Sequence, residues 1–186
     1  IYEGTSEIME MTIARERWQQ HLKTQGGYYR AKAAELRTVH TQHPTVGADV
    51  AALANDALAI VLEACRTGRL TRNQHILFRI GELIAHCEGA EIFAKRAAAA
   101  QTDSAHEKSL KRFDANTFAL MSRVYAREAA ARVALDGSRW VAGAADPGSP
   151  AVAAVSGIPT AAIQAAQAGL VTDMDAVADA IYGRNA

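Results

Sequence analysis

An apolar residue recurs every three or four positions through most of this 186-residue chain, and this spacing constrains the fold more than any other feature. The widest apolar stripe lies over 50–65, is closed by Gly68, and is typical of a helix that faces a core. The same spacing predicts further helices over 8–26, 28–40, 76–97 and 110–136, and shorter ones over 160–168 and 173–182. We therefore predict an all-α fold, an antiparallel helix bundle with short C-terminal helices.

Glycine pairs and turn residues divide this series into three predicted regions. Gly26 and Gly27 end or bend the first helix, and Asp136-Gly137 ends the last long one. Beyond Gly137 the composition shifts to Gly, Ala, Pro and Ser, which is typical of a linker. The predicted regions are an N-terminal segment over 1–26, a helical-bundle extension over 27–137, and a linker with short terminal helices over 138–186.

The stripes also predict which side chains share the core. Cys65 and Cys87 lie within apolar helical patterns without paired spacing, so we expect two reduced, buried thiols. The shared core is predicted to contain Leu58, Val61, Leu83, Ile84, Leu120 and Val124.

The charge balance excludes several classes of function. Lys and Arg total 20, as do Asp and Glu, so no net field favours nucleic acid or anionic lipid. No apolar run approaches the roughly 20 residues that a membrane span needs. The apolar stretch 151–171 lacks the basic face of interfacial helices, which favours packing on protein. We expect a cytoplasmic protein, with peripheral membrane association left open.

The histidines and basic clusters give no pattern typical of a binding site. We predict no metal site and solvated imidazoles at His21, His40, His43, His75, His86 and His106. Two basic groups are likewise predicted to be solvated rather than phosphate-binding: Arg66, Arg69 and Arg72, and Lys108, Lys111 and Arg112.

The most specific chemical feature is the opening octapeptide, Ile1-Tyr2-Glu3-Gly4-Thr5-Ser6-Glu7-Ile8. It places a carboxylate on a turn just before a predicted helix. Such a carboxylate can project into a cleft while the following amides face the polar atoms of a ligand. This arrangement suits a general base.

The octapeptide resembles the segment by which flavin-dependent acyl-CoA dehydrogenases deliver their catalytic glutamate. The resemblance implies that Glu3 removes the α-proton of an acyl-CoA thioester and that Gly4 lets this substrate approach closely. It also implies that Thr5, Ser6 and Glu7 contact FAD, the cofactor that accepts the hydride. An electron-transfer acceptor, a homo-oligomer and a place in fatty acid β-oxidation are expected by the same resemblance.

The residues after the motif partly follow the family. Met9-Glu10 stands where many relatives have Gln-Arg or Leu-Arg, so a contact made by that arginine is not carried over. A helical extension behind the motif, with the stretches 73–79 and 106–108, is similar to the very-long-chain branch.

Because the chain begins at Ile1 inside the motif, we expect a portion of a longer enzyme that is inactive alone. The alternative is a non-catalytic helical interaction or membrane-docking module for subunit assembly.

Overall fold

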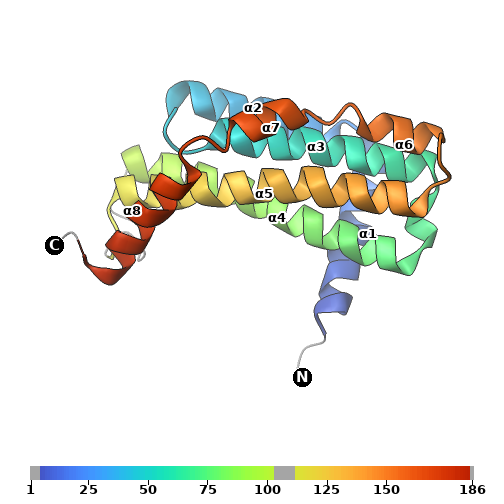
Figure 1. Cartoon of the computed structure of the whole chain (residues 1–186), viewed down its shortest axis with the longest axis horizontal. Helices are drawn as coiled ribbons and strands as arrows, with labels where there is room; N and C mark the ends of the chain where they lie inside the picture. The colour runs from blue at the N-terminus through green and yellow to red at the C-terminus, as the bar shows by residue number, and fades with distance from the viewer. Residues whose placement is uncertain (1–4, 103–111, 185–186) are drawn as a thin grey trace.

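The computed structural model describes residues 5–102 and 112–184, and every regular element within these ranges is a helix. In chain order they are α1 (Ser6–Lys23), α2 (Tyr28–Gln42), α3 (Ala48–Thr67), the short 3₁₀ helix η1 (Leu70–Arg72), α4 (Gln74–Thr102), α5 (Ala115–Ala144), α6 (Pro150–Val155), α7 (Thr160–Ala165) and α8 (Leu170–Tyr182) (Figure 1). The predicted all-α helix bundle with short C-terminal helices is confirmed. None of the helices in the described ranges is long and apolar enough to cross a membrane.

Helix α3 lies at the centre of the bundle and packs against α2, α4, α5 and α6. Because neighbours surround it, Leu58, Val61 and Leu62 are almost fully buried. The apolar stripe over 50–65 therefore faces the core, as the sequence predicts. Cys65 and Cys87 are buried free thiols, also as predicted, and burial raises the pKa of Cys65 to about 12.

Helix α5 continues past the point where its end was predicted. The Asp136-Gly137 pair lies inside the helix, which runs on to Ala144, so the predicted boundary at 137 falls within α5. Gly137 lies in close contact with α3, because a β-carbon at this position would stand 2.5 Å from Cγ2 of Val61. The glycine lets α3 and α5 approach closely, and the helix tolerates it.

The predicted core residues of α3 and α4 are buried, but those of α5 are not the residues that face the core. Leu83 and Ile84 are buried, like their predicted partners on α3, whereas Leu120 and Val124 are only half-buried. Apart from Phe118, the buried residues of α5 are small, and they include Ala119, Ser122, Ala126, Ala129, Ala130 and Val133. Small side chains let the helix axes come together, so the core positions of α5 are filled mainly by them rather than by Leu120 and Val124.

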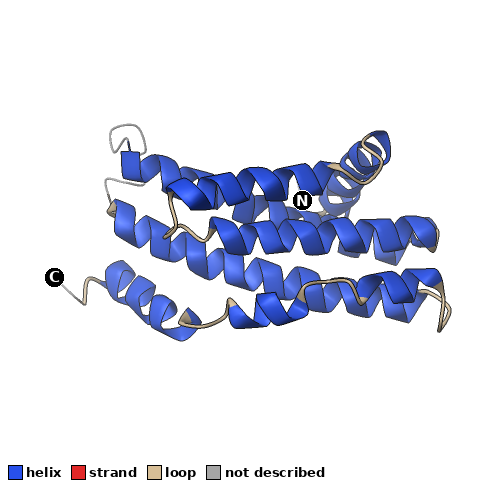
Figure 2. Cartoon of the chain, turned by 90° about the horizontal axis from the view of Figure 1, so that it is seen from above, coloured by secondary structure: helices blue, strands red, loops and turns tan. Residues whose placement is uncertain are grey.

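The C-terminal helices follow one another along one side of the bundle (Figures 1 and 2). Ala151, Ile158 and Ile163 are buried, so much of the apolar stretch 151–171 packs on the bundle itself. Helix α8 begins at Leu170 after the left-handed Gly169, three residues earlier than predicted. It contacts α5.

Helix α1 runs across the bundle rather than along it. It packs mainly on α4, and its first turns project beyond the bundle (Figure 1). Ile8 and Met9, in these turns, are 50% and 55% exposed.

Candidate functional site

The site predicted from the sequence lies at the projecting end of α1. Glu3 and Gly4 fall outside the described residues, whereas Thr5, Ser6 and Glu7 lie within them and are exposed. Thr5 is the extended N-cap residue, and its carbonyl oxygen accepts the amides of Ile8 at 3.1 Å and Met9 at 3.3 Å. The octapeptide therefore leads directly into a helix N-terminus, as the sequence predicts.

The charge of Glu7 is set by this helix end. Its own backbone amide, and then the Thr5 hydroxyl, donate to the carboxylate and lower the pKa of Glu7. A carboxylate here also interacts favourably with the positive end of the helix dipole. Glu7 is therefore an ionised hydrogen-bond acceptor at neutral pH, next to the hydroxyls of Thr5 and Ser6.

The base of this projecting end is fixed to α4 at one close crossing. A β-carbon on Gly81 would stand 2.1 Å from the carbonyl oxygen of Glu10, so only glycine allows this approach. Arg79 of α4 lies 3.6 Å from the Glu10 carboxylate and 2.6 Å from that of Glu82. Residues 5–9 extend beyond this anchor.

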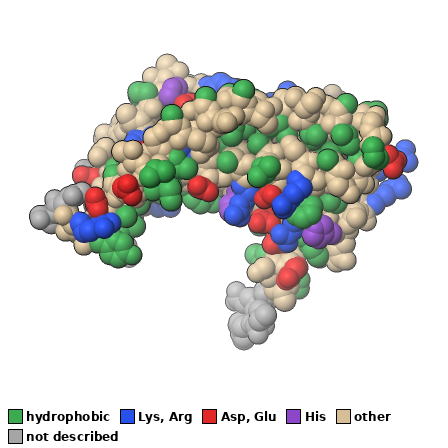
Figure 3. Space-filling view, viewed as in Figure 1, with side chains coloured by type: hydrophobic (Ala, Val, Ile, Leu, Met, Phe, Trp, Pro, Cys, Tyr) green, Lys and Arg blue, Asp and Glu red, His purple; other side chains and the backbone are tan. Residues whose placement is uncertain are grey.

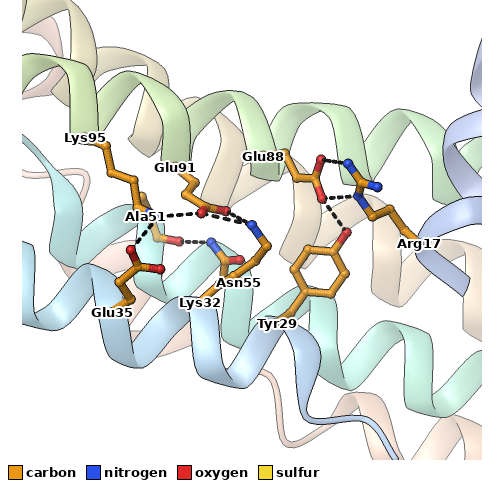
Figure 4. Close-up of polar contacts among 9 residues, drawn as sticks. All are labelled: Arg17, Tyr29, Lys32, Glu35, Ala51, Asn55, Glu88, Glu91 and Lys95. Carbon is orange, nitrogen blue, oxygen red and sulfur yellow. Dashed lines mark hydrogen bonds and ion pairs between the residues drawn. The ribbon is translucent and has the colours of Figure 1, made fainter. Parts of the chain in front are cut away.

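A second anchor lies further along α1, where three helices meet around Glu88 (Figure 4). Arg17 donates to the Glu88 carboxylate through Nε at 2.6 Å and Nη2 at 3.0 Å, and the Tyr29 hydroxyl donates to it at 3.0 Å. This hydrogen bonding raises the pKa of Arg17, and burial raises the pKa of Tyr29. Arg17 therefore stays protonated and Tyr29 keeps its phenolic proton, so the cluster positions α1 rather than transferring protons.

A neighbouring ionic cluster joins α2 to α4 around Glu91, whose side chain is almost fully buried (Figure 4). Lys32 approaches its carboxylate at 2.7 Å and Lys95 at 2.9 Å, and Lys95 also reaches Glu35 at 2.9 Å. Burial acts to raise the pKa of Glu91, but the two ammonium groups outweigh it, and the pKa is lowered. Glu91 is therefore an ionised structural group.

The sequence prediction of solvated histidines is wrong for His21. Its side chain is fully buried, stacks on Trp18 with ring centroids 5.6 Å apart, and directs Nε2 at Glu63 Oε2, 3.3 Å away. Arg66 holds the same carboxylate at 2.6 Å. Burial, the largest effect, lowers the pKa of His21. The imidazole is therefore neutral at pH 7.

His21 lies beside a surface pocket of about 330 Å³ lined by His21, Leu22, Gln25, Gly26, Glu63 and Arg66. An α-helix rises about 1.5 Å per residue, so this pocket is roughly 21 Å along α1 from Glu7. The pocket and the projecting end of α1 are therefore separate places on the molecule.

The two basic groups singled out in the sequence are only partly described by the structure. Arg66 is paired with Glu63, so it is less available to a phosphate than the sequence alone indicates. Lys108 and Lys111 lie outside the described residues. Within the described ranges, no three His, Cys, Asp or Glu side chains gather as a metal site requires.

Sequence reasoning missed both ionic clusters and the burial of His21. The available signal was the position of Glu88 and Glu91 on α4, where they flank the buried Cys87 and Ala90. Acids next to core positions need partners, but the partners come from α1 and α2, and sequence spacing does not identify them.

The comparison with known proteins found no relative of this chain. No protein-family model, no curated protein and no solved structure matches the chain.

Proposed function

We propose that this chain supplies the catalytic-base end, and a helical extension behind it, of a flavin-dependent acyl-CoA dehydrogenase. The observation that carries the proposal is the octapeptide of residues 1–8, whose last residues begin a helix that projects from the bundle. A projecting end can enter an active site formed by other segments. The exposure of Thr5, Ser6 and Glu7 supports this role because ligand-contacting groups must be accessible.

In the proposed reaction Glu3 acts as general base. Its carboxylate takes the proton from the α-carbon of the acyl-CoA thioester, while the β-carbon loses a hydride and a double bond forms between the two carbons. FAD, when bound, would supply the acceptor for this hydride, with an electron-transfer acceptor as its redox partner. Gly4 lets the thioester approach the backbone, and the Glu3 amide polarises its carbonyl oxygen.

The described residues fit the proposed contact with FAD. Thr5 and Ser6 present exposed hydroxyls, which donate and accept hydrogen bonds. Glu7 is ionised, so its carboxylate suits the hydroxyl groups of FAD better than the negatively charged pyrophosphate. The remaining FAD contacts would come from segments outside these residues.

The bundle would contribute rigidity rather than chemistry. Gly81 fixes the crossing of α1 on α4, and the Arg17–Glu88–Tyr29 cluster fixes the helix further along. A general base needs a defined position relative to its proton. Two fixed points on one helix provide a rigid base for the octapeptide.

A second candidate function, a helical interaction module, is favoured by apolar side chains that the described bundle leaves uncovered. Four of these exposed apolar side chains lie on α8: Val171, Met174, Ile181 and Tyr182. The two functions are compatible, because an extension can serve both catalysis and assembly.

The experiment that tests the proposed function uses the complete enzyme purified from cells that express its whole gene. We expect it to carry flavin, and the flavin absorbance to bleach when acyl-CoA thioesters of graded chain length are added without oxygen. A protein that never retains flavin, even after reconstitution with FAD, would contradict the proposal. Bleaching by none of the thioesters would also contradict it.

A further inference from the structure

A row of alternating charges connects α1 to α4 and α5. Arg132 of α5 donates to Glu82 of α4 at 3.3 Å, and Arg79 donates to the other oxygen of Glu82 at 2.6 Å. The second amino group of Arg79 then lies 3.6 Å from the Glu10 carboxylate of α1. Charged side chains gather on the face of the bundle from which the end of α1 projects (Figure 3). The row therefore ends at the base of the projecting segment.

Arg79 is the member of this row that reaches α1. Its Nε atom and the Oε2 atom of Glu10 are both shielded from solvent, and neither makes a hydrogen bond within the described parts of the chain. The Glu10 oxygen therefore depends on the nearby charge of Arg79, and this attraction is stronger than in water because the atoms are desolvated. Without Arg79 a shielded carboxylate oxygen would lack any compensating charge.

Glu10 is also the first tie between α1 and the bundle. The residues from Thr5 to Met9 are all exposed, and Glu10 is the first described residue that is partly buried. Gly81 brings the main chain of Glu10 close to α4, but it offers no side chain that could hold the helix end. Helix ends open locally where few contacts hold them. The pair of Glu10 with Arg79 therefore holds the turn from which residues 5–9 extend.

The charge of Arg79 reaches further along the same segment. Glu7 and Glu10 lie three residues apart, so they are neighbours on the surface of α1. Hydrogen bonds from its own backbone amide and from the Thr5 hydroxyl lower the pKa of Glu7, and the charge of Arg79 adds to this effect. Arg79 thus attracts both acids at this end of α1.

We propose that Arg79 is a positioning residue for the proposed reaction: by holding Glu10, it sets the direction in which the octapeptide leaves the bundle and so the place of the base Glu3. Arg79 contacts neither the thioester nor the flavin in this role. A misplacement of about 1 Å can slow an enzymatic step about 100-fold, so a distant pair can control the rate. This inference rests on the proposed function, but the hold of Arg79 on α1 is measurable without it.

Hydrogen exchange in the 186-residue chain tests the hold on α1. Arg79→Gln and Glu10→Gln should each speed exchange of the amides of residues 9–12 at least about fivefold and leave α3 unchanged. The double variant should exchange about as fast as either single variant, because each change removes the same pair. The matched control is Arg132→Gln, since the partners of Arg132, Glu82 and His86, both lie on α4. It should exchange at residues 9–12 like the wild type.

Stopped-flow reduction of the flavin in the complete enzyme tests the consequence for the reaction. Arg79→Gln should lower the limiting rate about tenfold and change the half-saturating thioester concentration less than about twofold, because the base is displaced while substrate binding is not. Glu10→Gln should have the same effect, and the double variant should be slower than either by no more than about twofold. A variant that merely lost stability would contain less folded enzyme, but each bound flavin would be reduced at the wild-type rate.

A wild-type limiting rate in Arg79→Gln overturns the inference, as do single effects that multiply in the double variant. Slow reduction with unchanged exchange at residues 9–12 also overturns it, because Arg79 would then act by a route other than α1. A wild-type enzyme whose flavin no thioester reduces is a separate result. It contradicts the proposed function, and the positioning role falls with it, whereas the exchange rates still show whether Arg79 holds α1.

Discussion

Gly81 on α4 lies directly against the main-chain carbonyl of Glu10 on α1, and a β-carbon at Gly81 would stand 2.1 Å from that oxygen. Because the obstacle is backbone, Gly81→Ala must push the two helices apart. We expect a loss of about 1–3 kcal/mol in the free energy of unfolding, the usual cost of overpacking. Urea denaturation measures it.

The matched control for this prediction is Gly143→Ala on α5, where a β-carbon would meet nothing within 4 Å. Alanine is the better helix former, so this variant should gain about 0.5–1 kcal/mol. If both variants gained stability, helix propensity rather than the close crossing would govern Gly81.

Substitution of Glu91 is expected to lower the stability of the bundle. Glu91 is 4% exposed and pairs with both Lys32 and Lys95. Glu91→Gln removes the negative charge between them. Both ammonium groups can turn toward water, so we expect a loss of about 1.5–3 kcal/mol, the range for hydrogen bonds to charged groups. Glu128→Gln, an exposed control on α5, should stay within about 0.5 kcal/mol of the wild type. Equal melting temperatures for the two variants would show that the Glu91 pairs add nothing to stability.

Stability should fall as the solution is acidified below about pH 6.5, the ordinary pKa of histidine. The pKa values of His21 and His86 are lowered in the folded chain, chiefly by burial. In this range the unfolded chain binds protons that the folded chain does not, so each histidine contributes a slope of up to about 1.4 kcal/mol per pH unit.

The measurement is the free energy of unfolding at several pH values between 7 and 5. His21→Gln should flatten the decline, and the double variant with His86→Gln should flatten it further. Glu63 also has a lowered pKa, but its contribution is lost at lower pH, below the ordinary range of a carboxyl group. An unchanged slope in the double variant would assign the pH dependence to other groups.

The bundle is expected to act by packing. Leu83 is 2% exposed, and truncating such a residue to alanine costs about 2–5 kcal/mol. In the complete enzyme, Leu83→Ala should lower the melting temperature and leave the rate of flavin reduction in the folded fraction nearly unchanged. Calorimetry and stopped-flow absorbance on one sample would separate the two effects. A collapsed reduction rate with an intact melt would show that the bundle reaches the active site.

The sequence predicts the helices well where one stripe faces one core. The pattern over 50–65 is broad because α3 is surrounded, and the helix appears where the pattern predicts it. The prediction was wrong at Gly137, because a glycine that ends a helix and a glycine that admits a neighbouring helix look the same in a sequence. Only the contact with Val61 distinguishes them.

The orientation of α8 shows a second limit. Its apolar residues predict a helix, but they do not predict that its one buried residue is the acidic Asp173. Asp173 pairs with Arg123 and Arg127 of α5, and sequence spacing does not identify these distant partners. The candidate site has a different status. The octapeptide is singled out by its order of residues alone, and Thr5 is the N-cap of α1 as expected, while the resemblance and the role of Glu3 stay predictions.

The most direct test of the proposed function is the rate of flavin reduction by acyl-CoA in the complete enzyme carrying Glu3→Gln. Glutamine keeps the size of the side chain and removes its basicity, so flavin should stay bound while reduction slows at least about 100-fold. Glu16→Gln, the same change at an exposed position on α1, should reduce at the wild-type rate. A loss of only a few-fold in Glu3→Gln would contradict the account and assign the base to another residue.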